Sequence, residues 1–210
     1  MYSSEKAKTV LKKDVAYLSA GIHEDVKLVA VRFDRSIRGN YFIEFRFEKD
    51  GKTMSHTEWE PTKGTRTDEE FQSTCDNQFS RIDQILKCFY PNDEDRKFSG
   101  DSFKEFAEWI VTMLDNANKD TLLRVKIVYN NSGYTTLPKY ARYTFIEPMS
   151  LFNENKSVIV KLNIDLFEKP IVADQESSNA NPFQVADGTL NNMIPTQEPM
   201  SEDNPNGLPF

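Results

Sequence analysis

Residues 41–60 read YFIEFRFEKDGKTMSHTEWE, and this stretch decides the fold class. From Tyr41 to Glu48, every second residue is apolar and lies on the same face. This period of two is typical of a strand with one buried face. Asp50-Gly51 supplies the positive-φ residues of a tight hairpin turn. Thr53–Glu60 returns as a second strand, and Pro61 ends it. The face expected to point inward carries Tyr41, Ile43, Phe45 and Phe47.

Further strands are predicted on both sides of this hairpin. Val-rich composition indicates one at Glu24–Phe33, and alternation indicates others at Leu122–Tyr129, Tyr140–Glu147 and Ser157–Phe167. In the second of these, Val125 and Ile127 share the inward face with Leu123 and Tyr129. The last shows the cleanest alternation in the chain, with Val158, Val160, Leu162, Ile164 and Leu166 facing one way.

Residues 67–116 change to a helical period. Thr67–Glu70 and Ser102–Glu105 each fit a capping box, and each precedes apolar residues at helical spacing. The predicted fold is therefore mainly β, an OB-fold-like barrel of five to six strands with two helices between the third and fourth strands. An α+β sandwich fits the same order of elements.

Residues 171–210 differ from the rest of the chain in charge and composition. They hold six acidic side chains, no lysine or arginine, and five of the ten prolines. Without these six acids the formal net charge changes from −7 to −1, so the body is nearly neutral and can still carry a basic groove. We expect an N-terminal arm at 1–22, a folded domain at 23–170 and a disordered acidic tail at 171–210.

The end of this tail has the chemistry of a docking peptide. Acidic residues come first, turn-forming residues follow, and the chain ends on an aromatic residue that carries the terminal carboxylate. Such a tip suits a pocket with a basic rim on a partner protein, although a chance ending on a flexible terminus fits equally well. The residues expected to dock are Glu202, Asp203, Leu208, Pro209 and Phe210.

The positions out of phase with the predicted core mix cations and aromatic rings. A single nucleic-acid strand needs both, because bases stack on rings and phosphates pair with arginine and lysine. Ordinary solvated strand faces and edge packing explain the same residues. Trp59 fits either a stacking platform or a cover for the core. The candidate site consists of Arg32, Arg35, Arg38, Phe42, Arg46, Trp59, Arg124, Lys126, Tyr134, Lys139, Tyr140 and Arg142.

Signals for catalysis, metal binding and membrane insertion are missing from the sequence. His56-x-Glu58 begins like a zinc deaminase motif, but no Pro-Cys-x-x-Cys follows it. Cys75 and Cys88 are too far apart on one helix to form a disulfide, and reduced thiols indicate a cytosolic protein. No apolar run approaches the length of a membrane span. We therefore expect a cytoplasmic protein that is not an enzyme and has no metal or cofactor.

Several segments together resemble the single-stranded DNA-binding proteins that phages encode. These segments are Tyr17–Leu28, His56–Pro61, Leu123–Tyr129, Gly133–Tyr140 and Phe145–Pro148. The resemblance covers roughly residues 15–150, and no short motif within it defines the family. It implies an OB-fold that binds single-stranded DNA in the host cytoplasm.

The C-terminus separately is similar to that of bacterial single-stranded DNA-binding proteins. Glu202, Asp203, Pro209 and Phe210 match their acidic tail with a final Pro-Phe, although Asn204–Gly207 sets the acids back from the tip. In those proteins the tip recruits replication and repair enzymes. The helical insertion is longer than in the bacterial barrel, so we expect a monomer or a dimer rather than a tetramer.

Together these features predict a non-catalytic protein that binds single-stranded DNA with little sequence preference. It would protect the strand and recruit replication or recombination enzymes through its tip. Two alternatives belong to other classes: a protein-interaction or virion component that binds no nucleic acid, and a nuclease with scattered carboxylates.

Overall fold

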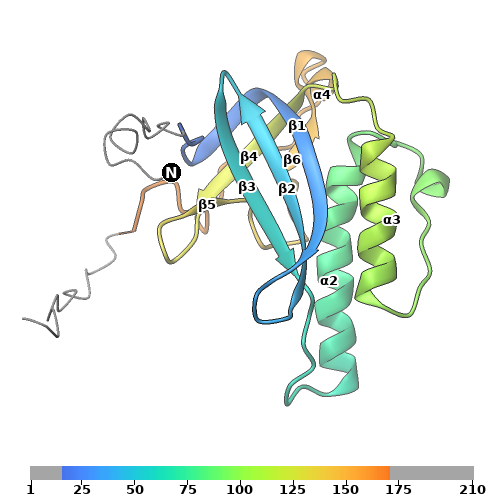
Figure 1. Cartoon of the computed structure of the whole chain (residues 1–210). Helices are drawn as coiled ribbons and strands as arrows, with labels where there is room; N and C mark the ends of the chain where they lie inside the picture. The colour runs from blue at the N-terminus through green and yellow to red at the C-terminus, as the bar shows by residue number, and fades with distance from the viewer. Residues whose placement is uncertain (1–15, 171–210) are drawn as a thin grey trace, which may run out of the picture. The chain divides into compact units, whose positions relative to one another are not determined.

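The structure, a computed structural model, describes residues 16–170 and is mainly β (Figure 1). Six antiparallel strands form one sheet in the order β3-β2-β1-β4-β5, and β6 pairs with β4 beside this path. The strands are β1 Gly21–Arg35, β2 Tyr41–Lys49, β3 Lys52–Trp59, β4 Leu123–Tyr129, β5 Thr135–Thr136 and β6 Ile146–Pro148. The sheet is open, because no ladder of backbone hydrogen bonds joins β3 to β5 in residues 16–170.

The long strand β1 joins the two halves of the sheet. Its first part pairs with β4, from Gly21 opposite Ile127, and its later part pairs with β2, as far as Arg35 opposite Tyr41. The register shifts once in each ladder, and Asp25 has a positive φ of 54°. Such irregularities bend a strand and increase its twist, which lets one strand serve two neighbours in different directions.

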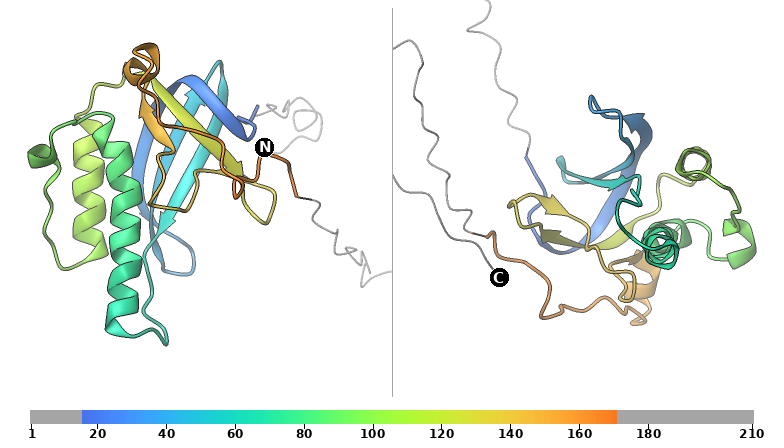
Figure 2. Two further views of the ribbon diagram at one scale, coloured as in Figure 1. Left: turned by 180° about the vertical axis from the view of Figure 1, so that it is seen from behind. Right: turned by 90° about the horizontal axis from the view of Figure 1, so that it is seen from below.

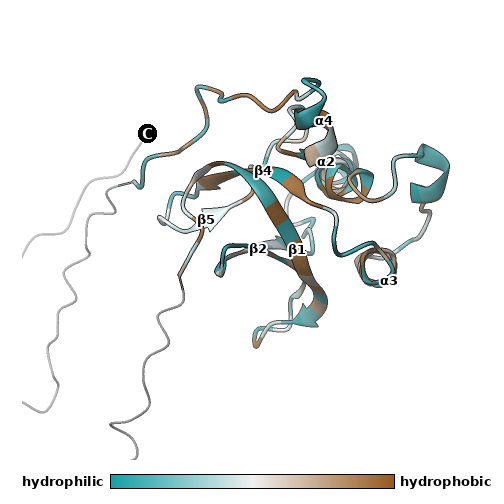
Figure 3. Cartoon of the chain, turned by 90° about the horizontal axis from the view of Figure 1, so that it is seen from above, coloured by the Kyte–Doolittle hydropathy of each residue, from teal (hydrophilic) through white to brown (hydrophobic). Residues whose placement is uncertain are grey.

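The core lies on the inner faces that the alternation predicts. Ile43, Phe45 and Phe47 on β2 are completely buried, and so are Val125 and Ile127 on β4. Full burial of a side chain of this size contributes about 1.5–3 kcal/mol. Figure 3 shows the same alternation as bands of hydrophilic and hydrophobic residues along β1. These inward positions are confirmed, whereas Tyr41 and Tyr129, also expected to point inward, are only half-buried. The hairpin turn is confirmed too, because Asp50 and Gly51 both have positive φ.

Two helices between β3 and β4 lie side by side next to the sheet (Figures 1 and 2), as predicted. In α2, Asp68–Lys87, Thr67 and Glu70 form the complete capping box. In α3, Phe103–Asp115, the hydroxyl of Ser102 caps the helix, whereas Glu105 accepts a hydrogen bond from the backbone of Asp101. A 3₁₀ helix, Asp93–Arg96, connects the two, and α4, Met149–Asn153, follows β6.

The predicted strand at Ser157–Phe167 is wrong. Residues 157–167, here called the strap, run across β4 without joining a ladder, although Tyr129 N–H donates to the carbonyl of Leu166. The strap turns its apolar face to solvent, and Val158 is 60% exposed. Asp165 points inward instead, because its carboxylate pairs with a lysine of β4. The buried ion pair, and not the apolar alternation, therefore decides which side of the strap faces the protein. The strand expected at Tyr140–Glu147 is reduced to β6.

The described part of the chain reaches beyond the expected domain at its N-terminal side. Leu18 is buried in the core, and its N–H donates to the carbonyl of Thr53 at the start of β3. No helix among residues 16–170 is long and apolar enough to cross a membrane. The tail at 171–210 and its docking tip lie outside the described residues.

Candidate nucleic-acid interface

The outer face of β1, β2 and β3 brings four of the predicted site residues together. Strand register places Phe42 opposite Trp59, while Arg46 lies opposite Ser55 on the same face. On the other side of β2, Arg32 of β1 lies opposite Glu44. Side chains opposite one another on one face of a sheet are close enough to interact. This surface, Arg32, Phe42, Glu44, Arg46 and Trp59, is called the outer face below.

An aromatic pair lies at one end of the outer face. The ring centroids of Phe42 and Trp59 are 5.1 Å apart, with the ring planes tilted by 50°. The guanidinium of Arg32 lies 5.4 Å from the Phe42 centroid. These neighbours leave Phe42 only 9% exposed, whereas Trp59 is 49% exposed. Phe42 points outward as predicted, but Trp59 provides the accessible stacking surface.

The two arginines of the outer face are already paired with carboxylates. Glu44 Oε2 lies 3.0 Å from Arg32 Nη2, and Glu44 Oε1 lies 3.9 Å from Arg46 Nη2. Asp34 also pairs with Arg32 at 3.1 Å. Both guanidinium groups remain about half exposed. The charge of this surface is therefore locally balanced, and an incoming phosphate would compete with Glu44.

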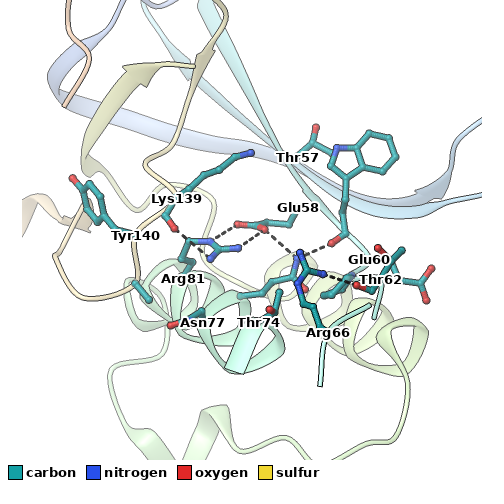
Figure 4. Close-up of a pocket in the computed structure, with 14 residues that line it drawn as sticks. Thr57, Glu58, Glu60, Thr62, Arg66, Thr74, Asn77, Arg81, Lys139 and Tyr140 are labelled. Carbon is teal, nitrogen blue, oxygen red and sulfur yellow. Dashed lines mark hydrogen bonds and ion pairs between the residues drawn. The ribbon is translucent and has the colours of Figure 1, made fainter. Parts of the chain in front are cut away.

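A pocket of about 650 Å³ lies next to the outer face and includes Trp59 in its lining. Its walls come from the end of β3, the connection to α2, the middle of α2 and the segment around Lys139 and Tyr140. Figure 4 shows that Arg66, Arg81 and Lys139 enter the pocket from three separate segments. The predicted residues Trp59, Lys139 and Tyr140 are thus gathered in one place.

Glu58 is a buried residue in the lining of this pocket, and it holds Arg81 in position. Arg81 donates two hydrogen bonds of 2.8 Å to the carboxylate, and Gln78 adds a third of 3.0 Å. His56 Nε2 lies 3.2 Å from Glu58 Oε1. Burial alone would raise the pKa of Glu58, but the hydrogen bonds from Arg81 and His56 outweigh it and hold this pKa well below its ordinary value.

His56 links β3 to the far end of the sheet. Its Nδ1 lies 2.9 Å from the hydroxyl of Thr136 on β5, while its other nitrogen faces Glu58. Both ring nitrogens therefore have structural partners. Residues 16–170 contain no group of three or more His, Cys, Asp and Glu side chains placed to hold a metal ion.

The predicted outward position of the β4 cations is wrong. Lys126 is completely buried, with its Nζ 2.8 Å from Asp165 of the strap and 2.8 Å from the hydroxyl of Tyr140. Arg124 contacts Ser157 and Glu147 and is mostly buried. The strap covers both side chains, so neither is available to a phosphate in this conformation.

Tyr140 contacts the strap and also lines the pocket. Tyr140 is among the residues that line the pocket, but its hydroxyl points away from the pocket (Figure 4) and donates to Asp165 at 2.9 Å. Burial and the neighbouring Asp165 carboxylate raise the pKa of this phenol. Tyr140 therefore anchors the strap through its hydroxyl.

The remaining predicted residues are exposed but lie away from the pocket lining. Arg35 ends β1 and Arg38 lies in the β1–β2 turn. Tyr134 follows the turn after β4, and Arg142 lies 5.9 Å from the ring of Tyr143. The five tip residues, Glu202, Asp203, Leu208, Pro209 and Phe210, lie outside the described part of the chain.

The prediction missed Arg66, Arg81 and the role of Glu58. A signal for two of them was present, because Glu58 shares its strand parity with the buried His56 and Met54. A carboxylate at an inward position needs a cation, and the following helix is the nearest source. Arg66 lies in a loop, where no periodicity marks its position.

No family model matches this chain, and neither the curated proteins nor the solved structures contain a match to it. Its function must therefore be inferred from the geometry of its surface. That surface offers an exposed indole, exchangeable ion pairs and a cation-lined pocket side by side. Together these groups can hold a flat ring and an adjacent phosphate.

Proposed function

We propose that this protein binds single-stranded DNA with little sequence preference and performs no catalysis on it. Bases stack on Trp59, and phosphates pair with Arg32 and Arg46 on one side of it and with Arg66 and Lys139 on the other. A ring accepts any base, so this mode of binding has little sequence dependence. The expected setting is replication, recombination and repair in the cytoplasm, with the C-terminal tip recruiting partner enzymes.

One observation carries this proposal: Trp59 lies where the outer face and the pocket meet. It pairs with Phe42 across the strands and lines the pocket together with Arg66 and Lys139. A strand stacked on Trp59 would therefore have cations within reach in both directions. Scattered surface arginines would not provide such continuity.

The strand order supports the finer proposal of an OB-type barrel. In such a barrel the first strand pairs with both the second and the fourth, as β1 does with β2 and β4. The contact between His56 and Thr136 draws β3 toward β5, the two ends of the open path. Side-chain contacts would then complete a barrel that the backbone ladders leave open.

Titration with a fluorescently labelled oligothymidylate tests the proposal directly. With about three to five phosphate contacts, the slope of log K against log salt should be roughly −2 to −3.5, at about 0.7 per contact. Anisotropy measured from low to high salt gives this slope. Absence of binding at low salt, or an affinity independent of salt, would refute the proposal, and turnover of DNA with magnesium would favour a nuclease instead.

Replacement of Glu44 by glutamine should tighten DNA binding. The carboxylate competes with phosphate for Arg32 and Arg46, and exposed ion pairs of this kind contribute about 0.2–1 kcal/mol. Kd for oligothymidylate should fall by about 1.5- to 5-fold at low salt, and the gain should shrink as salt screens the pairs. Glu48→Gln, at the other end of β2, is the matched control. Weaker binding by Glu44→Gln would show that the carboxylate positions the arginines productively.

A further inference from the structure

The turn between β1 and β2 is held firmly by its own polar groups. Ser36 N–H donates to Asn40, Gly39 N–H donates to Ser36, and the Ser36 hydroxyl accepts from Asn40 N–H. Arg35 Nε donates to the Gly39 carbonyl at 2.7 Å, and its guanidinium lies 5.2 Å from the ring of Tyr41. The turn is therefore fixed before any ligand arrives.

Glycine is required at position 39 for this bracing. Its φ is +87°, and a Cβ there would lie 3.2 Å from Arg35 Nη2. A side chain would thus strain the backbone and push the guanidinium away from the turn. Gly39 and Arg35 together therefore maintain the conformation of this turn.

This rigid turn presents an aliphatic side chain to water. Ile37 is fully exposed and lies at the tip, a place where glycine, asparagine, aspartate or proline is usual. A β-branched side chain has few rotamers, so little conformational freedom remains to be lost on contact. Arg38 beside it is exposed and makes no ion pair or hydrogen bond with any residue from 16 to 170. The exposed apolar side chain suits the space between two stacked bases, and the cation next to it suits the adjacent phosphate.

We propose that Ile37 is a wedge that inserts between neighbouring bases while Arg38 holds the adjacent phosphate. Aliphatic side chains open the base steps of duplex DNA in this way in other proteins, and here the step belongs to a single strand. This inference rests on the proposed function, because it needs a DNA strand on the outer face. It adds an activity that stacking alone does not provide: local unstacking of the bound strand.

The position of the tip fits a strand that lies on the outer face. Asp34 is opposite Phe42, and Ile37 follows it by three residues along the same edge of the hairpin. Three residues span at most about 10 Å, so the tip lies within roughly 10 Å of the residue that pairs with Phe42. Stacked bases are about 3.4 Å apart, so this distance corresponds to at most about three bases. One strand can therefore contact Trp59 and the tip together.

The test uses an oligodeoxyadenylate with one 2-aminopurine, whose fluorescence is quenched by stacking and recovers when it is unstacked. At saturating full-length protein the probe should brighten, and Ile37→Ser should reduce this increase at least two-fold. Ile37→Leu should preserve it, because the wedge remains apolar. Val158→Ser, which removes another exposed aliphatic side chain on the strap, is the matched control and should change nothing.

The possible outcomes separate this inference from the proposed function. If wild type binds DNA with the expected salt slope but Ile37→Ser brightens the probe as much as wild type, the wedge is wrong and DNA binding stands. If wild type does not bind DNA at all, the proposed function and the wedge are both refuted, and the exposed tip becomes a candidate contact for a protein partner. Equal loss in Ile37→Ser and Val158→Ser would also overturn the wedge, since it would indicate a nonspecific effect.

Discussion

Glu58→Ala should lower the free energy of unfolding by about 3 kcal/mol at pH 7, which corresponds to a fall in Tm of roughly 6–12 °C. The substitution leaves Arg81 without the carboxylate that accepts two of its hydrogen bonds, and it removes one of the two partners of Gln78 and one of the two partners of His56. Breaking a buried ion pair from one side costs about 3–5 kcal/mol. We expect the lower end, because Arg81 borders a pocket that water can enter. Urea denaturation followed by circular dichroism measures the change.

Glu60→Ala is the matched control for this variant. Glu60 also lines the pocket, but it makes no ion pair with other residues that the structure describes. Its removal should change the unfolding free energy by no more than about 0.5 kcal/mol. Equal losses in the two variants would mean that the Glu58 network contributes nothing particular to stability.

The same network should make stability depend on pH below about 5. The pKa of Glu58 is lowered in the folded protein, so the unfolded chain binds the proton more readily. The stabilisation is complete above the unfolded pKa of about 4.3 and is lost as pH falls toward the folded pKa. Glu58→Gln should therefore approach wild type in stability between about pH 5 and pH 3. A constant difference over that range would contradict the assignment.

The hairpin and the two helices could be predicted because each depends on local signals. Alternation in YFIEFRFE placed Ile43 and Phe45 correctly, and Thr67 with Glu70 marked the start of α2. These patterns act through neighbours in sequence, so the chain displays them directly. The strap shows the opposite case. Its alternation is as clean as that of β2, yet it forms no strand, because the contact that places it comes from Lys126, far away along the chain.

The candidate site was only partly predictable for the same reason. Trp59, Lys139 and Tyr140 converge, but the sequence could not show that the strap would cover Arg124 and Lys126. Parity identifies which face a residue occupies. It does not identify what later segment will cover that face.

Trp59→Ala should weaken binding of oligothymidylate by roughly 5- to 150-fold, the equivalent of about 1–3 kcal/mol for one base–aromatic stack. Trp59 is the largest exposed ring at the junction of the outer face and the pocket, and Phe42 beneath it is too buried to replace it. Stacking involves no phosphate, so the salt slope should stay the same while the affinity falls. Anisotropy titrations at several salt concentrations separate the two quantities.

Two further variants decide whether the loss belongs to stacking at this position. Trp59→Phe keeps a ring over Phe42 and should retain most of the affinity. Tyr17→Ala removes a more exposed ring beside Thr53, at the opposite end of β3, and should bind as wild type does. Because the Phe42–Trp59 pair contributes about 0.5–1.5 kcal/mol to folding, each variant must be folded at the assay temperature, as a melting curve can verify. If a folded Trp59→Ala protein binds as tightly as wild type, the junction is not where the bases lie, and the exposed indole serves only to cover Phe42.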